Sequence, residues 1–586
     1  MSDLATVVLA VSAAVGALVA WPIPVPAAAA VVVVGLFVRR ASVVIVGAAL
    51  LTAGLAARSW SGLHPPRVGG FRGTATLVSD PSSDGGETRV DVRIGGKRVE
   101  AWAHGRAAQA LAPRLAGERV AVAGRLEAVP SGARPGLAAR HVAARMSVES
   151  VGAWAPGDPS SRLANGVRRT LGRGAQSMSV SERSLFLGFV LGDDRGQSAE
   201  VVDDFRSSGL AHLLVVSGEN LAFVLALVAP LLRRLSIPGR LAAAACVLLF
   251  FGVLTRWEPS VLRAVAMVSV SLLAWAVGRP ASRVRLLALA VTGLLVIDPL
   301  LVHSVGFLLS VGACTGIAVL AGPLARALPG PRPLASALSV TMAAQLGVAP
   351  VLVPVFGGVP VASVPANLLA VPAAGPVMMW GLAAGLPGGV VGGAVAHAIC
   401  LPTIGLIGWI AAVARWSAAA PLGRLGLVHV AALSALLLAG VALPSRRARA
   451  LLLCAAVMVL AQPGLALAAG SSQSNRQISA GARLWRDGRA TVLVVDRARP
   501  DQLLRAVHDA GLHALDVVIL TRSGRTSATA VDVLLARVPA RVVAAPPGAR
   551  LSRTRAVAAA GEISVGRLTV GMTPGAAGIE VRVRRR

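Results

Sequence analysis

The sequence predicts a polytopic α-helical membrane protein with about 13 transmembrane helices, a small β-barrel domain and a C-terminal α/β domain. Of the 586 residues, 55% are hydrophobic and only 14% are charged, against about 25% charged residues in soluble domains. Apolar segments of about 20 residues, long enough to cross a bilayer core, recur along most of the chain. Two polar regions interrupt them, and both show the apolar patterning of strands, so we expect them outside the lipid.

The chain is strongly basic. It has 57 lysine and arginine residues against 27 aspartate and glutamate residues, a formal net charge of +30. Such a balance suits cytoplasmic loops, lipid headgroups and nucleic acid alike. The four cysteines lie inside apolar runs without paired spacing. We expect them to be packing residues, and we expect no metal and no cofactor.

The N-terminal membrane region, residues 1–60, is expected to form three helices. Its first apolar stretch resembles a signal peptide but lacks a basic start, and further apolar segments follow at once. We therefore interpret it as a membrane helix. The breaks come at "WPIPVP" and at Arg39-Arg40. The expected helices cover 4–20, 24–38 and 41–57.

A polar domain is expected at 66–156. Runs such as "TRVDVRIGGKRVEAWAHG" and "ERVAVAGRLEAV" alternate apolar and polar residues, as half-buried strands do. Gly95-Gly96 can supply the positive φ angles of a hairpin turn. Four or five short strands in about 90 residues predict a small barrel of the OB type.

Residues 158–207 are predicted to form interfacial amphipathic helices. The run "SRLANGVRRTLGRGAQSM" places Leu163, Val167 and Leu171 on one helical face and arginines on the other. That arrangement suits a lipid headgroup layer. Ser198 is expected to cap the helix that begins with "AEVVDDFRSS".

A membrane bundle is predicted at 209–467, and its arginines indicate its orientation. If Arg39-Arg40 is cytoplasmic, alternation places the later loop clusters inside as well, as the positive-inside rule requires. The N-terminus is then cytoplasmic, and both polar regions lie outside. Arg415 and Arg424 are exceptions to this scheme. The predicted spans are 209–232, 240–255, 261–278, 285–300, 303–322, 335–356, 362–386, 391–413, 425–443 and 449–467.

Polar residues inside these spans are the main functional candidates. A charge at the bilayer centre costs about 2.5–3.5 kcal/mol on insertion scales, so such residues tend to face a cavity or a partner. Beside Glu219, Ser217-Gly218 favours a kink or an unwound turn, which only a buried or water-lined backbone tolerates. The alternative is that Glu219 pairs with an arginine such as Arg263 and only locks the bundle. The pore candidates are His212, Ser217, Gly218, Glu219, Asn220, Arg263, Asp298, Gln345 and Asn367.

The same region resembles a known family. "SERSLFLGFVLGDDRGQSAEVVDDFRSSGLAHLLVVSGENLAFVLAL", followed by "EPSVLRAVAM" and "MAAQLGVAPVLVPVFGGVPVASVPANLLAVP", is similar to the signature of the ComEC competence proteins. These are inner-membrane channels for transforming DNA, and the resemblance covers about 182–375. The resemblance implies a multi-pass cell-membrane protein that takes up single-stranded DNA. It implies that an OB-like module precedes the membrane bundle. It also implies a DNA receptor outside and a cytoplasmic motor or strand-binding protein, since the chain has no Walker-type loop.

Two departures from the family matter. Asn220 stands where the family often has a histidine, and an amide cannot titrate near neutral pH. Many relatives carry a metallo-β-lactamase-type nuclease, with a His- and Asp-rich motif after the strand that corresponds to "LDVVILT". Here "RSGRTSATAVD" follows, and its side chains cannot hold two divalent metals. We therefore expect 471–586 to be a degenerate domain of this type, without catalytic or metal-binding residues.

DNA contacts are predicted on both polar regions. Residues 471–586 contain 19 arginines against 8 acidic residues, a surface suited to phosphate contact, with a headgroup-binding face as the alternative. In the first region, Phe71 and Trp102 can stack on bases. The basic candidates are Arg72, Lys97, Arg98, Arg106, Arg522 and Arg525.

Other functions stay open at the level of sequence. The same broken helices would serve a transporter of a small or lipidic solute, and a non-transporting envelope scaffold would also retain them. The missing ligands disfavour an active nuclease. A homodimer is compatible with the sequence, although nothing in the sequence requires one.

Overall fold

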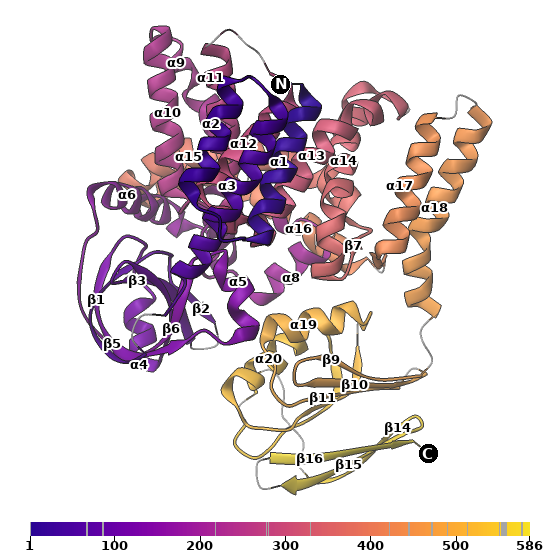
Figure 1. The fold of residues 1–586 in the computed structure, drawn as a ribbon. Helices are drawn as coiled ribbons and strands as arrows, with labels where there is room; N and C mark the ends of the chain where they lie inside the picture. Colours follow the sequence, from indigo (N-terminus) through magenta and orange to yellow (C-terminus); the bar gives the residue numbers. More distant parts are fainter. Residues whose placement is uncertain are drawn as a thin grey trace.

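The computed structural model is largely helical, with two regions of β-sheet (Figure 1), and the predicted fold class is confirmed in this coarse form. The structure describes residues 2–65, 68–84, 87–216, 218–276, 278, 281–328, 330–420, 422–442, 446–469, 473–488, 490–512, 514–549, 551–552, 560–575 and 578–585.

Three helices open the chain. Each begins and ends within a few residues of its predicted range, except that the third helix extends to Gly62 instead of residue 57. The side chain of Ser2 caps the first helix by accepting a hydrogen bond from the amide of Ala5. The first and third helices pack closely at Gly16, where a Cβ would lie 2.1 Å from the carbonyl oxygen of Ala49. The helices are α1 (Asp3–Val19), α2 (Val25–Phe37) and α3 (Ala41–Gly62).

The first polar region, which we call the β domain, forms one six-stranded sheet. Its ladders link β1 to β5, β5 to β6, β6 to β4, β4 to β3, and β3 back to β1. The β4–β6 ladder is parallel. Alternate side chains such as Leu77, Val99 and Met146 fill the interior. The elements are β1 (Gly69–Leu77), β2 (Ser82–Asp84), β3 (Glu87–Ile94), β4 (Lys97–His104), α4 (Gly105–Leu111), β5 (Arg119–Ala128), η1 (Ser131–Ala133), α5 (Arg134–Ala138) and β6 (Val142–Ala155).

Three helices lead from the β domain into the bundle, and they differ in burial. Ser198 accepts a hydrogen bond from the amide of Val201, so the predicted cap of the third helix is confirmed. The middle helix is not an amphipathic surface helix, because Phe186 and Phe189 are buried in the bundle core. On the first helix, Arg168 is also buried, so the prediction that its arginines share an outer face is wrong there. The elements are α6 (Pro159–Gly174), η2 (Ala175–Ser177), α7 (Val180–Leu191) and α8 (Ala199–Ser207).

The bundle contains a helix at each predicted span. Six of the described helices are long and apolar enough to cross a membrane, namely α3, α10, α13, α14, α15 and α16. The total of about 13 spans stays a prediction. The bundle elements are η3 (Ala211–Leu213), α9 (Gly218–Leu232), α10 (Ile237–Leu254), α11 (Pro259–Ala276), α12 (Arg283–Ile297), η4 (Pro299–His303), α13 (Val305–Ala327), α14 (Arg332–Phe356), β7 (Val359–Pro360), α15 (Ser363–Val391), α16 (Gly393–Ala419), β8 (Arg424–Leu425), α17 (Leu427–Ala442) and α18 (Arg446–Ala469).

Glycines bring the bundle helices close together. A Cβ on Gly347 of α14 would lie 2.2 Å from the carbonyl oxygen of Gly312 on α13, and one on Gly316 would lie 2.1 Å from that of Ala343. Small residues allow this close approach between membrane helices. The N-terminus and the α9–α10 turn lie at the end of the bundle opposite the two sheet regions (Figure 1).

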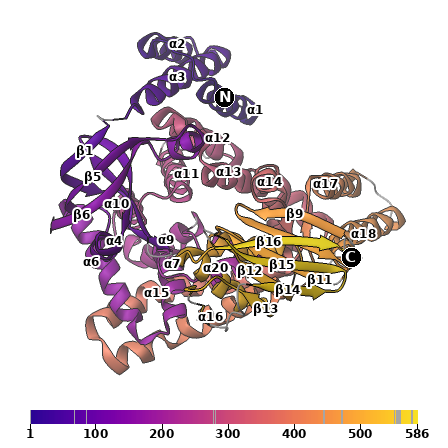
Figure 2. The same cartoon turned by 90° about the horizontal axis from the view of Figure 1, so that it is seen from below.

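The second polar region, which we call the tail, has two sheets. The larger sheet has the order β13-β12-β11-β10-β9, with parallel ladders between β11, β12 and β13, and the smaller has the order β14-β15-β16. Helices cover one face of the larger sheet, and the smaller sheet packs on the other (Figure 1). Seen from below, the smaller sheet lies in front of the larger one (Figure 2). The elements are β9 (Gln473–Ser479), β10 (Ala482–Asp487), β11 (Ala490–Val495), α19 (Pro500–Asp509), β12 (Leu515–Leu520), α20 (Arg525–Leu535), β13 (Ala540–Ala544), β14 (Gly561–Val565), β15 (Leu568–Gly575) and β16 (Gly578–Arg585).

Candidate functional site

The first bundle span is a broken helix. In place of one helix over 209–232, the short η3 and a turn come first, and α9 begins only at Gly218. Gly209 has a φ of 76°, and a Cβ there would lie 2.3 Å from the Cβ of Ser363 on α15. Both its conformation and its surroundings therefore require a glycine. The break places the N-terminus of α9 against other helices.

Arg263 lies at the junction where α9, α11 and α13 meet. Its side chain is buried, and it donates from Nε to Ser310 Oγ at 2.6 Å and from Nη1 to Cys314 Sγ at 2.8 Å. A Cβ on Gly218 would lie 3.0 Å from the Arg263 guanidinium. Across the described ranges, no carboxylate lies within ion-pair distance of Arg263. The junction therefore holds a buried cation whose partners are a hydroxyl and sulphur atoms.

The neighbouring candidates have different surroundings. Glu219 is exposed on α9, whereas Asn220 donates to the carbonyl oxygen of Phe189 at 2.9 Å and so ties α9 to α7. His212 lies in η3 and is exposed, and Ser217 lies outside the described residues. Gly218 is therefore the candidate that the structure brings against Arg263.

The remaining candidates come from other helices. Asn367 on α15 is buried and donates to the carbonyl oxygen of Ser363 at 2.6 Å, within its own helix. Gln345 is half-buried on α14. Two cavities, one beside Trp60 and one beside Leu163, are lined by none of the eight pore candidates that the structure describes.

Asp298 connects the bundle to the β domain. Its Oδ2 lies 2.8 Å from Nε2 of His141, and its Oδ1 accepts from the amide of Leu300 at 3.1 Å. His141 has a φ of 57°, in the left-handed region that non-glycine residues rarely occupy. These contacts give Asp298 a role in joining two regions, which its position near a span end did not indicate.

A buried charge network also joins the β domain to the bundle. Arg168 Nη2 lies 2.7 Å from Asp80 and 3.1 Å from Asp193, and its side chain is only 3% exposed. Arg256, with a φ of 61°, approaches Asp80 at 3.0 Å. Burial alone would raise the pKa of Asp80, but the guanidinium groups of Arg168, Arg256 and Arg195 lower this pKa to about 2. We call these five residues the anchor network; the sequence did not single them out as functional.

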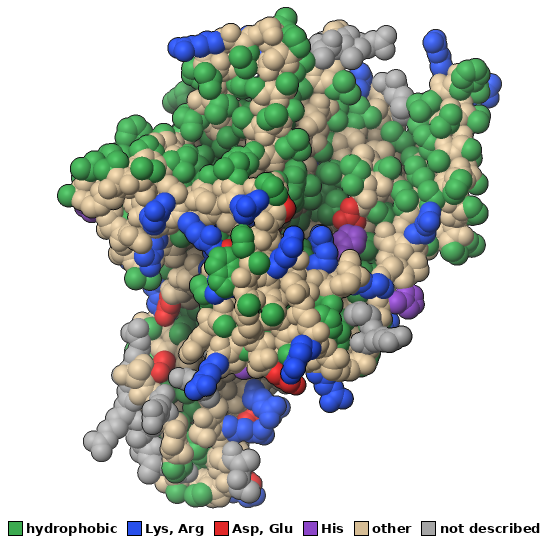
Figure 3. All heavy atoms as spheres, turned by 90° about the vertical axis from the view of Figure 1, so that its left-hand side faces the viewer, with side chains coloured by type: hydrophobic (Ala, Val, Ile, Leu, Met, Phe, Trp, Pro, Cys, Tyr) green, Lys and Arg blue, Asp and Glu red, His purple; other side chains and the backbone are tan. Residues whose placement is uncertain are grey.

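The basic candidates of the β domain have separate roles. Arg72 and Arg106 are exposed, whereas Lys97 donates to the carbonyl oxygens of Gly62 and His64, and Arg98 donates to that of Arg140. Figure 3 shows the side of the molecule on which the β domain lies. Most of its lysine and arginine side chains lie below the apolar upper part.

The aromatic candidates of the β domain are both partly buried. Phe71 packs against the interior of the sheet, which limits its use as a stacking platform. Trp102 lies between the guanidinium groups of Arg89 and Arg145, at 5.8 and 6.0 Å from its ring centre. Its face already has cationic neighbours.

In the tail, the turn after β12 is basic and is partly neutralised. Arg522 Nε lies 2.8 Å from Asp496, and Arg525 begins α20. His513 lies outside the described residues. The described ranges contain no group of histidine, cysteine and acidic side chains that could hold a metal ion.

Charged side chains also join the tail to α8. Arg537, just beyond α20, forms an ion pair with Asp204, and His508 Nδ1 on α19 lies 3.8 Å from Asp203. Both aspartates are largely buried. Burial and the nearby Asp509 carboxylate raise the pKa of Asp203 to about 6, although surrounding arginines oppose this shift.

A second set of contacts joins the tail to the turns between bundle helices. Arg424 Nε of β8 lies 3.3 Å from Asp509 Oδ1. Arg505 donates to the carbonyl oxygen of Phe356 at 2.8 Å, and Arg424 donates to the same oxygen at 3.1 Å. We call this set, together with the α8 contacts, the tail interface.

Comparisons with known proteins find sequence similarity over part of the chain. A family model described as "Competence protein" matches residues 189–447. The chain is 28% identical over 206 residues to a protein of Escherichia coli (strain K12) described as "Uncharacterized protein YcaI". That match covers 32% of this chain and 27% of the relative, and no solved structure matches. The matched region runs from the end of α7 to the start of α18, and it includes the Arg263 junction.

Proposed function

We propose that this chain is a cell-membrane channel that admits one strand of DNA during natural transformation. The observation that carries the proposal is the competence-family match over 189–447. The matched region contains a broken helix, at Gly218, and a buried cation, Arg263. Discontinuous helices with polar groups at depth are how membrane proteins build translocation paths. In this proposal the α9–α11–α13 junction opens to let phosphates pass Arg263.

The proposed orientation places both sheet regions outside the cell and the N-terminus in the cytoplasm. The arginines of the α9–α10 turn, Arg233 and Arg234, lie at the bundle end opposite the β domain and the tail (Figure 1). Cytoplasmic loops carry the excess of arginine and lysine. Incoming DNA then meets the β domain and the tail before the bundle.

We further propose that the β domain is an OB-type module. The circuit β1–β3–β4–β6–β5–β1, the parallel β4–β6 ladder and the helix α4 between β4 and β5 support this assignment. OB folds bind strands of nucleic acid on the face of their second and third strands and in adjacent loops. Arg89 and Trp102 lie on the corresponding strands, β3 and β4.

The tail is proposed to be a metallo-β-lactamase-like domain that guides DNA without cleaving it. Its 19 arginines against 8 acidic residues suit salt-sensitive contact with phosphates. The driving force then comes from other proteins, namely a receptor outside and a cytoplasmic motor or strand-binding protein. Metal-dependent cleavage by the full chain would contradict this assignment.

The test is import of labelled DNA into a competent host with and without the gene. We expect deletion to abolish import, and Arg263→Gln to reduce it while membrane abundance is unchanged. Arg326→Gln is the matched control, because Arg326 lies at the end of α13, far along the helix from Ser310. Normal import after deletion would end the channel proposal and favour a small-solute transporter. A parallel fall in import and abundance for Arg263→Gln would favour a scaffold.

A further inference from the structure

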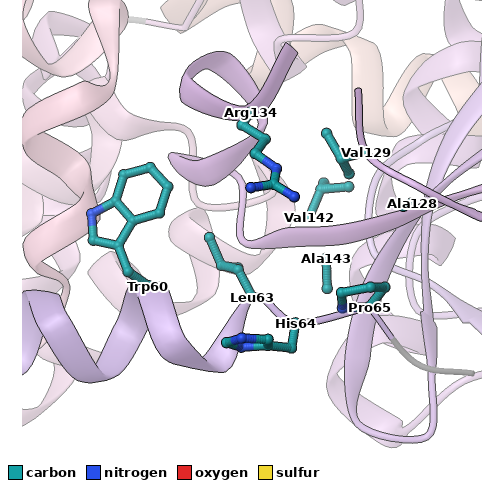
Figure 4. Close-up of a pocket in the computed structure, with 9 residues that line it drawn as sticks. All are labelled: Trp60, Leu63, His64, Pro65, Ala128, Val129, Arg134, Val142 and Ala143. Carbon is teal, nitrogen blue, oxygen red and sulfur yellow. The ribbon is translucent and has the colours of Figure 1, made fainter. Parts of the chain in front are cut away.

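A cavity of about 150 Å³ lies between the end of α3 and the β domain. Trp60 lines one side, Arg134 of α5 lies across from it, and His64 closes the lower edge (Figure 4). Leu63, Val129 and Val142 make the rest of the lining largely apolar. The volume is below the roughly 300 Å³ at which sites for drug-sized ligands begin, so the cavity suits a single ring system.

The indole of Trp60 is held in place by its surroundings. The ring of His303, at the end of η4, meets it edge-on with 5.4 Å between ring centres. An aromatic ring fixed in this way offers a flat apolar surface at low entropic cost. Such rings stack on nucleobases without preference for one base, because every base has an aromatic face.

Arg134 is a cation that is available for a ligand. It is exposed, and in the part of the chain that the structure describes no carboxylate lies within ion-pair distance of it. Its neighbours differ, since Arg140 pairs with Asp91 and Glu100, and Arg145 pairs with Glu100. A guanidinium can bind a phosphate with two parallel hydrogen bonds.

A second cation, Lys97, lies beside the cavity. Lys97 Nζ lies 2.8 Å from the carbonyl oxygen of His64 and 3.2 Å from that of Gly62, so its ammonium group is fixed beside the cavity. Arg134 itself belongs to the connection between β5 and β6. In OB folds the corresponding loop is one that binds oligonucleotides. An apolar slot with an aromatic wall and cations at its edge fits one nucleobase, with the attached phosphate at the cations.

We propose that this cavity binds one nucleotide of a single strand, with the base against Trp60 and the adjoining phosphate at Arg134. The inference rests on the proposed function, and it adds a specific contact between α3 and the β domain that the sequence did not indicate. The strand would thereby be held where the β domain meets the first membrane helices.

The test measures binding of fluorescent oligothymidylate of about 12 nucleotides, within the site size of OB folds, to the full chain in lipid nanodiscs. An abasic oligomer of equal length serves as the second probe. We expect Trp60→Leu, which keeps an apolar side chain of large volume, to weaken oligothymidylate binding about fivefold or more and to leave abasic binding unchanged. We expect Arg134→Gln to weaken both and to lower the salt dependence by about one phosphate contact.

The matched control is Arg58→Gln, an exposed arginine of α3 that does not line the cavity. It should bind both probes within about twofold of the unmodified chain. If Trp60→Leu and Arg134→Gln bind oligothymidylate as Arg58→Gln does, the nucleotide site is wrong although the channel proposal stands. If the unmodified chain binds neither probe, both proposals fail.

Discussion

The β domain and the tail are both joined to the bundle by buried carboxylates and arginines, yet the two attachments differ in kind. Asp80, in the anchor network, has a pKa lowered to about 2, whereas Asp203, in the tail interface, has a pKa raised to about 6. Both side chains are largely buried, so burial alone does not explain the difference. Three guanidinium groups surround Asp80. Arginines also lie near Asp203, but burial and the carboxylate of Asp509 outweigh their effect on its pKa.

The two attachments differ in how completely their buried charges are paired. Within the anchor network every charge has opposite charges close to it, and Arg168 also donates to the carbonyl oxygens of Leu191 and Leu254. Breaking such a network leaves charges buried without partners, which is costly. The tail interface includes more exposed side chains, such as Arg537 at 37%, and two carboxylates that repel each other, those of Asp203 and Asp509. We infer a fixed β domain and a detachable tail.

The largest expected effect comes from removing the carboxylate of the anchor network. Asp80→Asn leaves Arg168 and Arg256 buried with one acidic partner fewer, which we expect to cost about 3–5 kcal/mol. Hydrogen exchange of the β1 and β5 amides, followed by mass spectrometry, measures this free energy. The control is Glu149→Gln, because Glu149 is exposed on β6 in the same domain. Equal protection of the two variants would show that other contacts hold the β domain.

A smaller effect is expected at the tail. Arg537→Gln leaves Asp204 buried without its guanidinium partner, and we expect docking to weaken by about 2 kcal/mol, since Arg537 is more than one third exposed. Release of the tail should speed amide exchange across α8. Arg541→Gln is the control, because the Arg541 side chain is 84% exposed in its pair with Asp516. Unchanged α8 exchange in Arg537→Gln would mean that apolar contacts hold the tail.

The two attachments also mark the limit of prediction from sequence. Local sequence patterns predicted the helices and their caps well. A cap such as Ser198 acts on an amide three residues away, and an apolar run can be recognised without knowing its partner. Arg168 was placed on an outer face because its helix is amphipathic. The structure buries it because Asp80 arrives from a loop 88 residues earlier in the chain. Nothing in the spacing of those residues indicates that meeting.

In the candidate site, too, local features could be predicted from the sequence and long-range contacts could not. The broken helix before Gly218 follows from the Ser-Gly pair and the polar residues beside it. Two partners of Arg263, Ser310 and Cys314, lie 47 and 51 residues further along the chain and carry no signal of their own. The sequence likewise did not indicate a role for Trp60 or Arg134, because only the fold brings the end of α3 beside the β5–β6 connection.

The pH dependence of docking should be the next smaller effect. The docked pKa of Asp203 is about 6, above its ordinary value of 3.8, so the docked state binds a proton more tightly than the released state. Docking therefore strengthens as the pH falls through 6, and we expect it to be about tenfold tighter at pH 5 than at pH 7. Exchange of α8, corrected for intrinsic rates, measures this change. In Asp203→Asn the pH dependence should disappear; if it persists, another group such as His508 controls docking.

The smallest effect is expected where the β domain meets Asp298. The side chains of His141 and Asp298 are 35% and 25% exposed, so the contact between them should contribute less than about 1 kcal/mol. His141→Asn keeps a residue type that tolerates a positive φ, and it should change β-domain exchange by no more than that amount. His141→Val places a β-branched side chain at a φ of 57° and should cost about 1 kcal/mol more, because the left-handed conformation brings its Cβ against the backbone. If His141→Asn instead cost as much as Asp80→Asn, the partly exposed pair would hold the β domain as strongly as the buried network. The contrast between a fixed β domain and a detachable tail would then no longer follow from burial and charge pairing.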